Sequence, residues 1–408
     1  MIGEIIAIGD ELTSGRIINT TSGFAARQLF AAGHEIVAMH TIGDTPALIG
    51  EALKRAIRRA DFVIVTGGLG ATSDDLTNEA VSKALNRPPT LHRGILNKIR
   101  ARLRGGTGDQ ALLEKLAWLP QGAEVLNAES RMAGYLLVDD ATPIFFLPGV
   151  PAQMKELMVE HVLPCLAGWS TDKRHHFRQR VYRTFGLGEN MINEYLRHME
   201  KTPQLKIGYY PVDSEVHVSL TVTGRDAGEA DALFAEADST ITALLGGFLY
   251  GCDQETLASV VGSLLLQQNR WLGVAESCTG GLLAGKITET AGSSQWFAGG
   301  VVAYSNFLKE QLLDVDSSLL AEHGAVSAPV ARAMAEGIQR RAGVEVAIGV
   351  TGIAGPSGGT DKKPVGTVFF GLCIGSTVTD QQYTFSGNRR EIQEISAQTA
   401  LDLVRRAL

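Results

Sequence analysis

The chain has 408 residues, of which 45% are hydrophobic and 20% are charged, a composition typical of a soluble protein with two or three domains. Its formal net charge of −7 argues against a broad electrostatic grip on nucleic acid, so we expect small-molecule partners instead. Four cysteines in so long a chain, none of them in a C-x-x-C pair, argue against a disulfide framework or a zinc site and favour a reducing cytoplasm. No apolar run is long enough to span a membrane, and the first residues do not resemble a signal peptide, so no membrane partner is expected.

Residues 1–170 alternate strand-like apolar runs with helix-like amphipathic ones. Strands are predicted at Glu4–Ile8, Glu35–Thr41, Asp61–Thr66 and Pro143–Leu147, and helices at Asn19–Ala32, Pro46–Arg59 and Ala152–Leu166. A repeated strand–helix–strand order implies a parallel sheet with helices on both faces. We therefore predict an α/β domain here.

A glycine-rich segment, Thr66–Thr77, directly follows the third predicted strand. Ligands of open α/β sheets bind at the carboxyl ends of strands, and glycines there let backbone N–H groups approach a phosphate. The segment is neither a Walker A motif nor a G-x-G-x-x-G motif, which argues against nucleoside-triphosphate hydrolysis and against NAD as a redox cofactor. The residues predicted to bind a phosphate-bearing substrate are Gly67, Gly68, Gly70 and Thr72.

Acidic residues follow the ends of three predicted strands. Asp74 and Asp75 lie within the glycine-rich segment, Glu11 follows the first strand beside Asp10, and Asp44 follows the second. All three loops are expected to converge on one edge of the sheet, where carboxylates suit a hydrated divalent cation that bridges protein and phosphate. We predict Asp74, Asp75, Glu11 and Asp44 as metal ligands. A tight turn followed by a helix N-cap is the alternative interpretation of the glycines and the aspartate pair.

Residues 171–250 have the pattern of a small α+β module. Alternating strands are predicted at Arg178–Gly186, Leu205–Tyr210 and Glu215–Thr223, and helices at Glu189–Glu200 and Ala227–Leu245.

Residues 251–408 form a third α/β region. Strands are predicted at Val344–Val350, Gly366–Ile374 and Thr379–Ser386, and helices at Gln254–Asn269, Leu282–Thr290, Ala328–Ala342 and Asn388–Leu408.

A candidate nucleophile lies between the apolar run Trp271–Val274 and a helix-like segment, in the string Ala275–Gly281. A strand-to-helix turn exposes such a side chain beside free backbone N–H groups, which can hold an anion or a developing oxyanion. The residues predicted to contact substrate through this turn are Cys278, Thr279, Gly280 and Gly281.

Two nucleophiles compete in this turn. Ser277 needs a proton acceptor, and Lys309 can serve as one if burial lowers its pKa, with Tyr304 placed to relay or orient the proton. Cys278 is a rival, because a helix N-terminus lowers a thiol pKa. The residues alone leave the choice open. They also allow Ser277 to be only an N-cap and Cys278 only a small buried hydrophobe.

A second glycine-rich loop follows the predicted strand Val344–Val350 and has the character of a phosphate or oxyanion site. Its predicted substrate contacts are Thr351, Gly352, Ala354 and Gly355. Arg389 and Arg390 open the last helix, where positive charge is unfavourable to the helix dipole unless an anionic ligand binds there. We predict that these arginines bind the ligand as well, and two solvated arginines are the alternative.

These strings together resemble the CinA (competence/damage-inducible) family over essentially the whole chain. Val65–Gly70, Asp74–Thr77 and Leu147–Pro151 are similar to its molybdopterin-binding-like N-terminal domain. Its C-terminal amidohydrolase domain is matched by Ala275–Gly281, Ala291–Ser294, Gly352–Pro356 and Lys363–Thr367. The resemblance divides the chain into a molybdopterin-binding-like domain (residues 1–170), a KH-like module (171–250) and a C-terminal domain (251–408).

The resemblance implies a bifunctional cytoplasmic hydrolase of pyridine-nucleotide salvage. The N-terminal domain resembles an ADP-ribose pyrophosphatase that uses a divalent metal such as Mg, Co or Mn. The C-terminal domain resembles a cofactor-independent deamidase that converts nicotinamide mononucleotide (NMN) to nicotinate mononucleotide and ammonia. In the family a serine, a lysine and a tyrosine do this chemistry, which matches Ser277, Lys309 and Tyr304.

The resemblance also implies a homodimer. It leaves two alternatives: a deamidase whose N-terminal domain only binds a nucleotide or a pterin-like ligand, and a non-enzymatic interaction protein of DNA uptake or damage. The middle module lacks a basic G-x-x-G loop, so RNA binding is not expected there.

Overall fold

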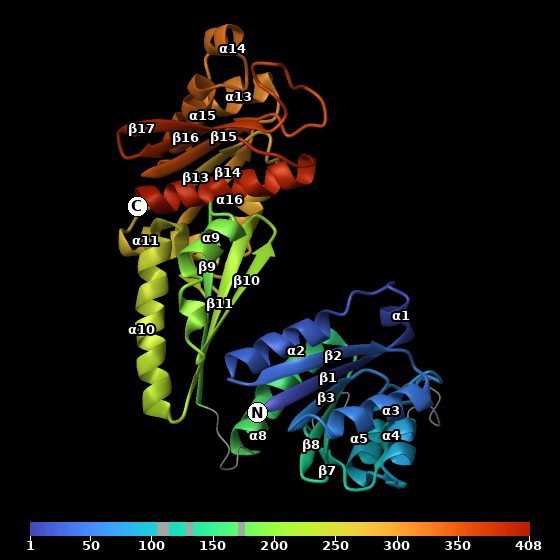
Figure 1. The fold of residues 1–408 in the computed structure, drawn as a ribbon. Helices are drawn as coiled ribbons and strands as arrows, with labels where there is room; N and C mark the ends of the chain where they lie inside the picture. Colours follow the sequence, from blue (N-terminus) through green and yellow to red (C-terminus); the bar gives the residue numbers. More distant parts are fainter. Residues whose placement is uncertain (104–113, 128–133, 170–175) are drawn as a thin grey trace. The chain divides into compact units, whose positions relative to one another are not determined.

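The computed structural model in Figure 1 describes residues 1–103, 114–127, 134–169 and 176–408. Backbone contacts divide the chain into two compact units. The first unit comprises Met1–Gln179 with Thr223–Ala230, and the second comprises Arg180–Val222 with Asp231–Leu408. The middle module therefore falls largely in one unit with the C-terminal domain, whereas the two predicted boundaries between the three domains stay predictions. None of the helices described here has the length and apolar character needed to cross a membrane.

The first unit is built on a six-stranded sheet in the order β2-β1-β3-β8-β7-β6. Its strands are β1 (Ile2–Ile8), β2 (Glu35–Ile42), β3 (Phe62–Thr66), β6 (Glu124–Val125), β7 (Tyr135–Asp139) and β8 (Thr142–Leu147). The predicted parallel sheet is confirmed for β2, β1, β3 and β8. The antiparallel pairing of β7 and β8 was not predicted. It follows from a tight hairpin in which Asp140 and Ala141 both take positive φ angles.

Helices cover both faces of this sheet, as predicted. They are α1 (Asp10–Thr13), α2 (Thr20–Ala31), α3 (Pro46–Ile57), α4 (Thr77–Ala84), α5 (Arg93–Leu103), α7 (Pro151–Leu157) and α8 (Leu163–Trp169). Alternation along β1 sends Ile5 into a cluster with α2 and α7, and Ile6 into a cluster with α3 and α4. A π-helical segment, Met158–Val162, joins α7 to α8 within the single helix predicted there. A separate pair, β4 (Pro89–Leu91) and β5 (Trp118–Pro120), is antiparallel.

The middle module is a four-stranded sheet in the order β10-β11-β9-β12, and it has the predicted α+β character. Its elements are β9 (His176–Phe185), α9 (Glu189–Leu196), β10 (Leu205–Val212), β11 (Glu215–Gly224), α10 (Ala227–Leu245) and β12 (Leu249–Cys252). Side chains of α9 and α10 form one hydrophobic cluster with those of β9 and β11.

The C-terminal domain has a five-stranded mixed sheet in the order β14-β13-β15-β16-β17. Its strands are β13 (Leu272–Glu276), β14 (Phe297–Val302), β15 (Val346–Gly352), β16 (Thr367–Ile374) and β17 (Thr377–Thr384). Strand β13 pairs in parallel with β14 and β15, whereas β16 and β17 are antiparallel to their neighbours.

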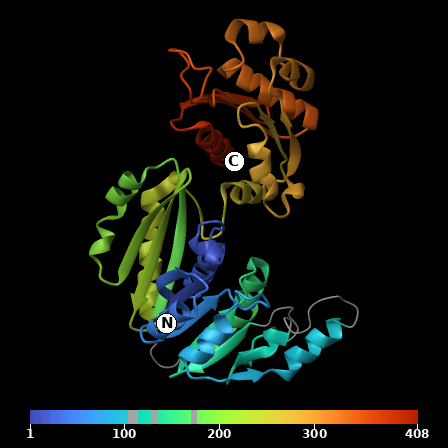
Figure 2. The same ribbon diagram turned by 90° about the vertical axis from the view of Figure 1, so that its right-hand side faces the viewer.

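Two helical layers sandwich this sheet (Figure 1). The helices are α11 (Leu257–Gln267), α12 (Leu282–Thr288), α13 (Asn306–Leu313), α14 (Ser317–His323), α15 (Ala328–Ala342) and α16 (Arg389–Ala407). Helices α11, α12 and α16 contribute to one hydrophobic cluster with the sheet, and α13, α14 and α15 contribute to another. Helix α16, dark red in Figure 2, leads to the end of the chain.

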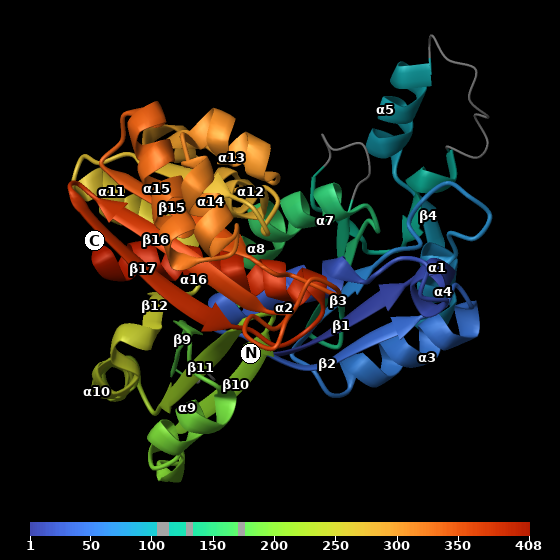
Figure 3. The same cartoon turned by 90° about the horizontal axis from the view of Figure 1, so that it is seen from above.

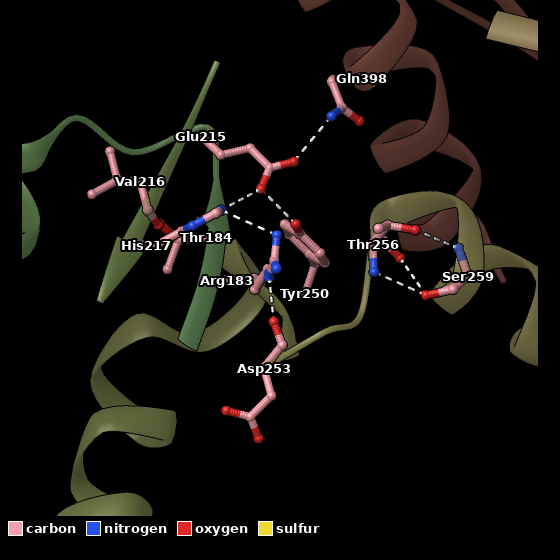
Figure 4. A network of polar contacts seen from close by, with 10 residues as sticks. All are labelled: Arg183, Thr184, Glu215, Val216, His217, Tyr250, Asp253, Thr256, Ser259 and Gln398. Carbon is pink, nitrogen blue, oxygen red and sulfur yellow. Dashed lines mark hydrogen bonds and ion pairs between the residues drawn. The ribbon is translucent and has the colours of Figure 1, made fainter. Parts of the chain in front are cut away.

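A polar network joins the middle module to the C-terminal domain within the second unit (Figure 4). The buried Glu215 carboxylate of β11 accepts hydrogen bonds from the Tyr250 hydroxyl at 2.5 Å and from Gln398 Nε2 of α16 at 3.0 Å. Phe185 of β9 and Tyr250 also belong to the hydrophobic cluster of the C-terminal domain. Shared apolar and polar contacts thus explain why the two parts form one compact unit.

Helix α15 packs against β15 and β16 (Figure 3). Glycines in these two strands allow its close approach. A Cβ atom on Gly349 would lie 2.5 Å from the Ala331 carbonyl oxygen, and one on Gly371 would lie 2.3 Å from the same atom. Such distances are far shorter than van der Waals contact, so the helix can pack here only because glycine has no side chain.

We expect Gly371→Ala to destabilise the C-terminal domain by about 1–3 kcal/mol, because its Cβ would meet helix backbone that cannot rotate away. Hydrogen exchange measured by mass spectrometry on the full chain should show faster exchange in β15 and β16. Gly285→Ala is the matched control, because a Cβ atom there meets nothing within 4 Å and alanine favours the helix. Equal exchange in the two variants would contradict the role of the close approach.

Candidate functional site

The candidate nucleophile lies in a turn, Ser277–Gly281, that connects β13 to α12; we call it the nucleophile turn. The Ser277 N–H donates to the Val350 carbonyl at 2.9 Å, which ties the turn to the end of the neighbouring strand β15. Gly280 and Gly281 have φ angles of 64° and 98°, in the left-handed region that favours glycine. The turn therefore places Ser277 at the carboxyl edge of the parallel part of the sheet.

The structure brings Lys309 against Ser277, although the two residues are far apart in sequence. Lys309 is on α13 with only 1% of its surface exposed, and its Nζ atom lies 3.0 Å from Ser277 Oγ. The same amine donates to the carbonyl oxygens of Ala303 at 2.8 Å and Tyr304 at 3.3 Å. Burial lowers the pKa of the Lys309 amine, which favours its neutral form.

A neutral amine has two N–H bonds and one lone pair. The carbonyls of Ala303 and Tyr304 can take both N–H groups, which leaves the lone pair free for the Ser277 hydroxyl proton. The arrangement therefore meets the geometric requirement for a lysine base acting on a serine nucleophile.

Cys278 lacks the properties of a reactive thiol. Its side chain is buried in the hydrophobic cluster beneath α16, and burial raises the pKa of the thiol to about 12. A thiol with so high a pKa stays protonated at neutral pH, whereas the attacking species of a cysteine enzyme is the thiolate. Of the two alternatives left open by the sequence, the local chemistry favours Ser277.

Tyr304 occupies a different place from the predicted relay. Its side chain is 58% exposed, and its hydroxyl accepts a hydrogen bond from the Arg389 guanidinium at 2.9 Å. Only its backbone carbonyl contacts Lys309. Among the described residues, therefore, the Tyr304 hydroxyl bonds to neither Ser277 nor Lys309.

The buried carboxylate of Glu276, which the sequence reasoning did not single out, organises the start of α12. It accepts backbone hydrogen bonds from Gly281 at 2.9 Å, Leu283 at 3.1 Å and Ala284 at 2.8 Å. Negative charge is favourable at a helix N-terminus, so an acidic residue just before a predicted helix was the signal that could have revealed it.

These contacts narrow the predicted set of oxyanion donors. The Gly281 N–H donates to Glu276, and the Gly280 N–H donates to the Ser277 carbonyl at 3.2 Å. Both glycines therefore shape the turn, and neither N–H is available to a substrate. Within the turn, the N–H groups of Cys278 and Thr279 donate to no oxygen of the described residues, although both lie near the Cys278 thiol and oppose the effect of burial on its pKa. The buried Thr279 hydroxyl has no hydrogen-bond partner among the described residues.

The second glycine loop, Thr351–Gly355, is largely structural. The Thr351 hydroxyl is buried and donates to the Ala325 carbonyl at 2.8 Å, Gly352 ends strand β15, and Ala354 is buried. The Gly355 carbonyl accepts from the Arg389 guanidinium at 2.7 Å. This loop therefore helps to orient Arg389.

Lys363, which was not predicted as a site residue, contacts the connection between α14 and α15. Its Nζ atom donates to the carbonyl oxygens of His323 at 3.2 Å and Val326 at 2.7 Å.

The two predicted arginines differ in position. Arg389 joins Gly355 to the Tyr304 hydroxyl, so its positive charge lies beside the loop that precedes Lys309. Arg390 instead forms an ion pair with Glu394 one turn along α16 and is mostly exposed. Only Arg389 is placed with the other predicted site residues.

The first unit carries the other predicted site, in the loop Gly67–Asp75. Cβ atoms on Gly67 and Gly68 would lie 2.1 Å from the Ile8 carbonyl oxygen and 2.2 Å from the Thr77 hydroxyl, so both positions require glycine. The Gly67 N–H donates to the Leu147 carbonyl at 3.1 Å and is not free for a ligand. The N–H groups of Gly68 and Gly70 have no partner in the described part of the chain.

Asp75 and Thr72 brace this loop. The Asp75 carboxylate accepts from the Thr72 N–H at 3.0 Å and from the Thr72 hydroxyl. Lys115 donates to the Thr72 carbonyl at 2.6 Å. Asp74 is exposed, and the Thr72 side chain that it shares with Asp75, its own backbone N–H and the charge of Lys115 lower its pKa, which favours the ionised form.

The predicted acidic loops do meet at one edge of the sheet. Asp10 and Asp44 exchange hydrogen bonds between each backbone N–H and the other carboxylate, at 2.8 and 3.1 Å. Burial raises the pKa of Asp44, and the nearby negative charges of Asp10, Glu11 and Asp74 add to that shift. Uncompensated like charges of this kind suit a bound cation.

The described residues contain no group of three or more His, Cys, Asp or Glu side chains arranged to hold a metal ion by themselves. A hydrated cation held by one or two carboxylates and completed by substrate phosphates, which is the usual Mg²⁺ arrangement, stays a prediction for these residues. They do not fit an all-protein cage formed by Asp74, Asp75, Glu11 and Asp44 together.

Known protein families match most of the chain. Residues 4–168 match the family described as "Probable molybdopterin binding domain", residues 179–251 match "Damage-inducible protein CinA KH domain", and residues 254–408 match "CinA C-terminal domain". A solved CinA superfamily structure from Klebsiella pneumoniae is 33% identical and covers 37% of this chain and 94% of that chain, with a TM-score of 0.36.

Two curated relatives align with nearly the whole of this chain. A "CinA-like protein" from Desulfotalea psychrophila is 53% identical over 406 residues, which cover 99% of this chain and 98% of the relative. A "Putative competence-damage inducible protein" from Moorella thermoacetica is 38% identical over 413 residues, which cover 100% of this chain and 99% of the relative. The chain therefore belongs to the CinA family.

Proposed function

We propose that the C-terminal domain is a serine amidase that deamidates NMN to nicotinate mononucleotide and ammonia. The observation that carries this proposal is the 3.0 Å contact between Ser277 Oγ and the buried amine of Lys309. A serine with an adjacent base and free backbone donors is the arrangement required for acyl transfer. The choice of NMN rests on the resemblance of the motifs to the CinA family.

The reaction proceeds through an acyl-enzyme. Ser277 Oγ attacks the carboxamide carbon while Lys309 takes its proton, and the N–H groups of Cys278 and Thr279 stabilise the oxyanion. As the C–N bond breaks, Lys309 returns the proton to the leaving nitrogen, and ammonia departs. Water then attacks the ester, Lys309 accepts its proton, and that proton returns to Ser277 Oγ as nicotinate mononucleotide leaves.

Arg389 supplies the positive charge for the substrate phosphate in this proposal. Its guanidinium is held by the Gly355 carbonyl and the Tyr304 hydroxyl, so it is already oriented before substrate binds. Orientation before binding reduces the entropy lost on binding. Tyr304 therefore acts here by holding Arg389, and not by relaying a proton.

The first unit is proposed as a metal-dependent ADP-ribose pyrophosphatase. Gly68 and Gly70 would offer N–H groups to the phosphates, and Asp74 with Asp44 would hold the cation. A divalent cation supplies charge neutralisation of the pyrophosphate and favours attack by water. The observation that favours this second activity is the meeting of three acidic loops beside the Gly68 and Gly70 N–H groups, which have no partner among the described residues. A domain that only binds a nucleotide or a pterin is the alternative.

The nucleophile assignment predicts that Ser277→Ala and Lys309→Ala each lower ammonia release from NMN by roughly 10³-fold or more. The double variant should lose little beyond either single one, because the pair acts as a unit. Cys278→Ala keeps its backbone N–H and should retain most of the rate. An active Ser277→Ala enzyme together with an inactive Cys278→Ala enzyme would show that the protein is a cysteine amidase.

The lowered pKa of Lys309 predicts the pH dependence of the reaction. Below that pKa the ammonium cannot accept a proton, and above it the neutral amine can, so kcat/KM for NMN should rise with pH through the Lys309 pKa. Tyr304→Phe should raise KM for NMN and leave this profile in place, because the hydroxyl bonds to Arg389. If Tyr304→Phe abolishes the rise, the hydroxyl is part of the proton path after all.

The N-terminal proposal predicts that a chelator, Asp74→Asn and Asp75→Asn each abolish cleavage of ADP-ribose to AMP and ribose 5-phosphate. Asp74→Asn removes a cation ligand, whereas Asp75→Asn also loosens the loop at Thr72. Ammonia release from NMN by the same samples is the internal control and should not change. If ADP-ribose binds but is not cleaved in the presence of any divalent metal ion tested, the result would support the alternative that the domain only binds its ligand.

A further inference from the structure

Two carbonyl groups of the nucleophile turn are held by hydrogen bonds from different sources. The Ser277 carbonyl accepts from the Gly280 N–H at 3.2 Å, within the turn itself. The Cys278 carbonyl accepts from Gln393 Nε2 at 2.8 Å, across 115 positions of sequence. Since a carbonyl oxygen can only accept, the amide nitrogen of Gln393 must face it.

Each of these carbonyls shares a planar peptide unit with a proposed oxyanion donor. The Ser277 carbonyl is joined to the Cys278 N–H, and the Cys278 carbonyl is joined to the Thr279 N–H. In a trans peptide unit the C=O and N–H bonds point in opposite directions, so holding the oxygen fixes the direction of the hydrogen. The turn thus fixes one donor by itself, and Gln393 fixes the other.

The hydrogen bond from Gln393 to the Cys278 carbonyl also makes the Thr279 N–H a stronger donor. A hydrogen bond donated to a peptide carbonyl polarises that unit and makes its N–H a better donor, because hydrogen bonds in a chain reinforce one another in a low-dielectric site. The site is of that kind, since Ser277, Cys278, Thr279 and Lys309 are all buried.

The position of Gln393 on α16 explains why its side chain reaches the nucleophile turn. Gln393 follows Arg389 by four residues, so the two side chains lie on one face of the helix. The Asn388 side chain caps the helix by accepting from the backbone N–H groups of Arg390 and Glu391, which fixes where that face begins. One helix face therefore contacts both the loop at Gly355 and the nucleophile turn.

We propose that Gln393 is a positioning residue of the amidase, which orients and polarises the Thr279 N–H toward the oxyanion through its hydrogen bond to the Cys278 carbonyl. This inference rests on the proposed amidase function. Gln393 touches no reacting atom in this scheme, so its removal should affect the transition state more than substrate binding.

Two nearly isosteric variants test this role in the full-length protein. Gln393→Met removes the donor, and Gln393→Glu, when ionised, places a negative charge against the Cys278 carbonyl. Both should lower kcat for NMN by about 10- to 100-fold, less than outright loss of an oxyanion donor, while KM changes by less than about 3-fold. The thermal unfolding midpoint of each variant is measured alongside, so that a folding defect is recognised.

A pH series separates the two variants from each other. A protonated glutamic acid can donate to the Cys278 carbonyl, whereas methionine cannot at any pH. The ratio of the Gln393→Glu rate to the Gln393→Met rate should therefore rise as the pH falls. A purely structural role for Gln393 gives no such trend.

Gln398→Met is the matched control on the same helix. Figure 4 shows that Gln398 faces Glu215 of the middle module, and its Nε2 atom donates to that carboxylate at 3.0 Å. This variant should leave kcat unchanged within about 2-fold. A similar loss of kcat in Gln398→Met would assign the effect to general loosening of α16.

Labelling of Ser277 by a fluorophosphonate, followed by mass spectrometry, tests the inference without NMN. The serine oxygen attacks phosphorus, fluoride leaves, and the phosphoryl oxygen occupies the same oxyanion site. Gln393→Met should slow labelling by about 10-fold or more, and Gln398→Met should not.

The outcomes separate the two proposals. Unchanged kcat and labelling in folded Gln393→Met would overturn the positioning role and leave the amidase proposal standing. A wild-type enzyme that releases no ammonia from NMN, but is labelled in a Gln393-dependent manner, would overturn the substrate and retain the positioning role. Loss of both signals in the wild-type protein would contradict both.

Discussion

The C-terminal site depends on the burial of one lysine amine. A charged ammonium is costly in a protein interior, and Lys309 meets that constraint through a lowered pKa and hydrogen bonds to two backbone carbonyls. Both carbonyls come from Ala303 and Tyr304, in the connection between β14 and α13. The remaining direction around the nitrogen is occupied by Ser277 Oγ, so the desolvation of Lys309 and its proposed function as a base have the same structural origin.

Helix α16 links this site to the rest of the second unit. Near its start, Arg389 and Gln393 contact the second glycine loop and the nucleophile turn. Further along, Gln398 contacts Glu215, and Arg405 donates to the Gly247 carbonyl at 2.6 Å in the middle module. The two ends of one helix thus contact the site and the middle module, and residues of both parts belong to one hydrophobic cluster.

Backbone hydrogen bonds decide which glycines of a glycine-rich loop can serve a ligand. In the first unit the Gly67 N–H donates to the Leu147 carbonyl, so of the glycines in this loop only Gly68 and Gly70 have N–H groups that are left for a ligand among the described residues. In the nucleophile turn both glycine N–H groups donate to nearby oxygens, whereas those of Cys278 and Thr279 donate to no oxygen in the described part of the chain. Glycine in these loops is required mainly by backbone conformation and close packing, because a Cβ atom would meet neighbouring backbone or side chains or require a left-handed φ.

The sequence by itself determined the α/β class, most of the longer helices and strands, and the strand-to-helix turn that carries the candidate nucleophile, because hydrophobic periodicity is a local property. Helices α10 and α15 begin and end where that periodicity predicts. Strand β14 was missed because Gly299 and Gly300 interrupt its apolar pattern. Only the tertiary structure supplied the burial of Cys278, the Ser277–Lys309 contact that favours Ser277 in our proposal, and the contact of Gln393, because such features do not exist until the sheet and its helices have packed together.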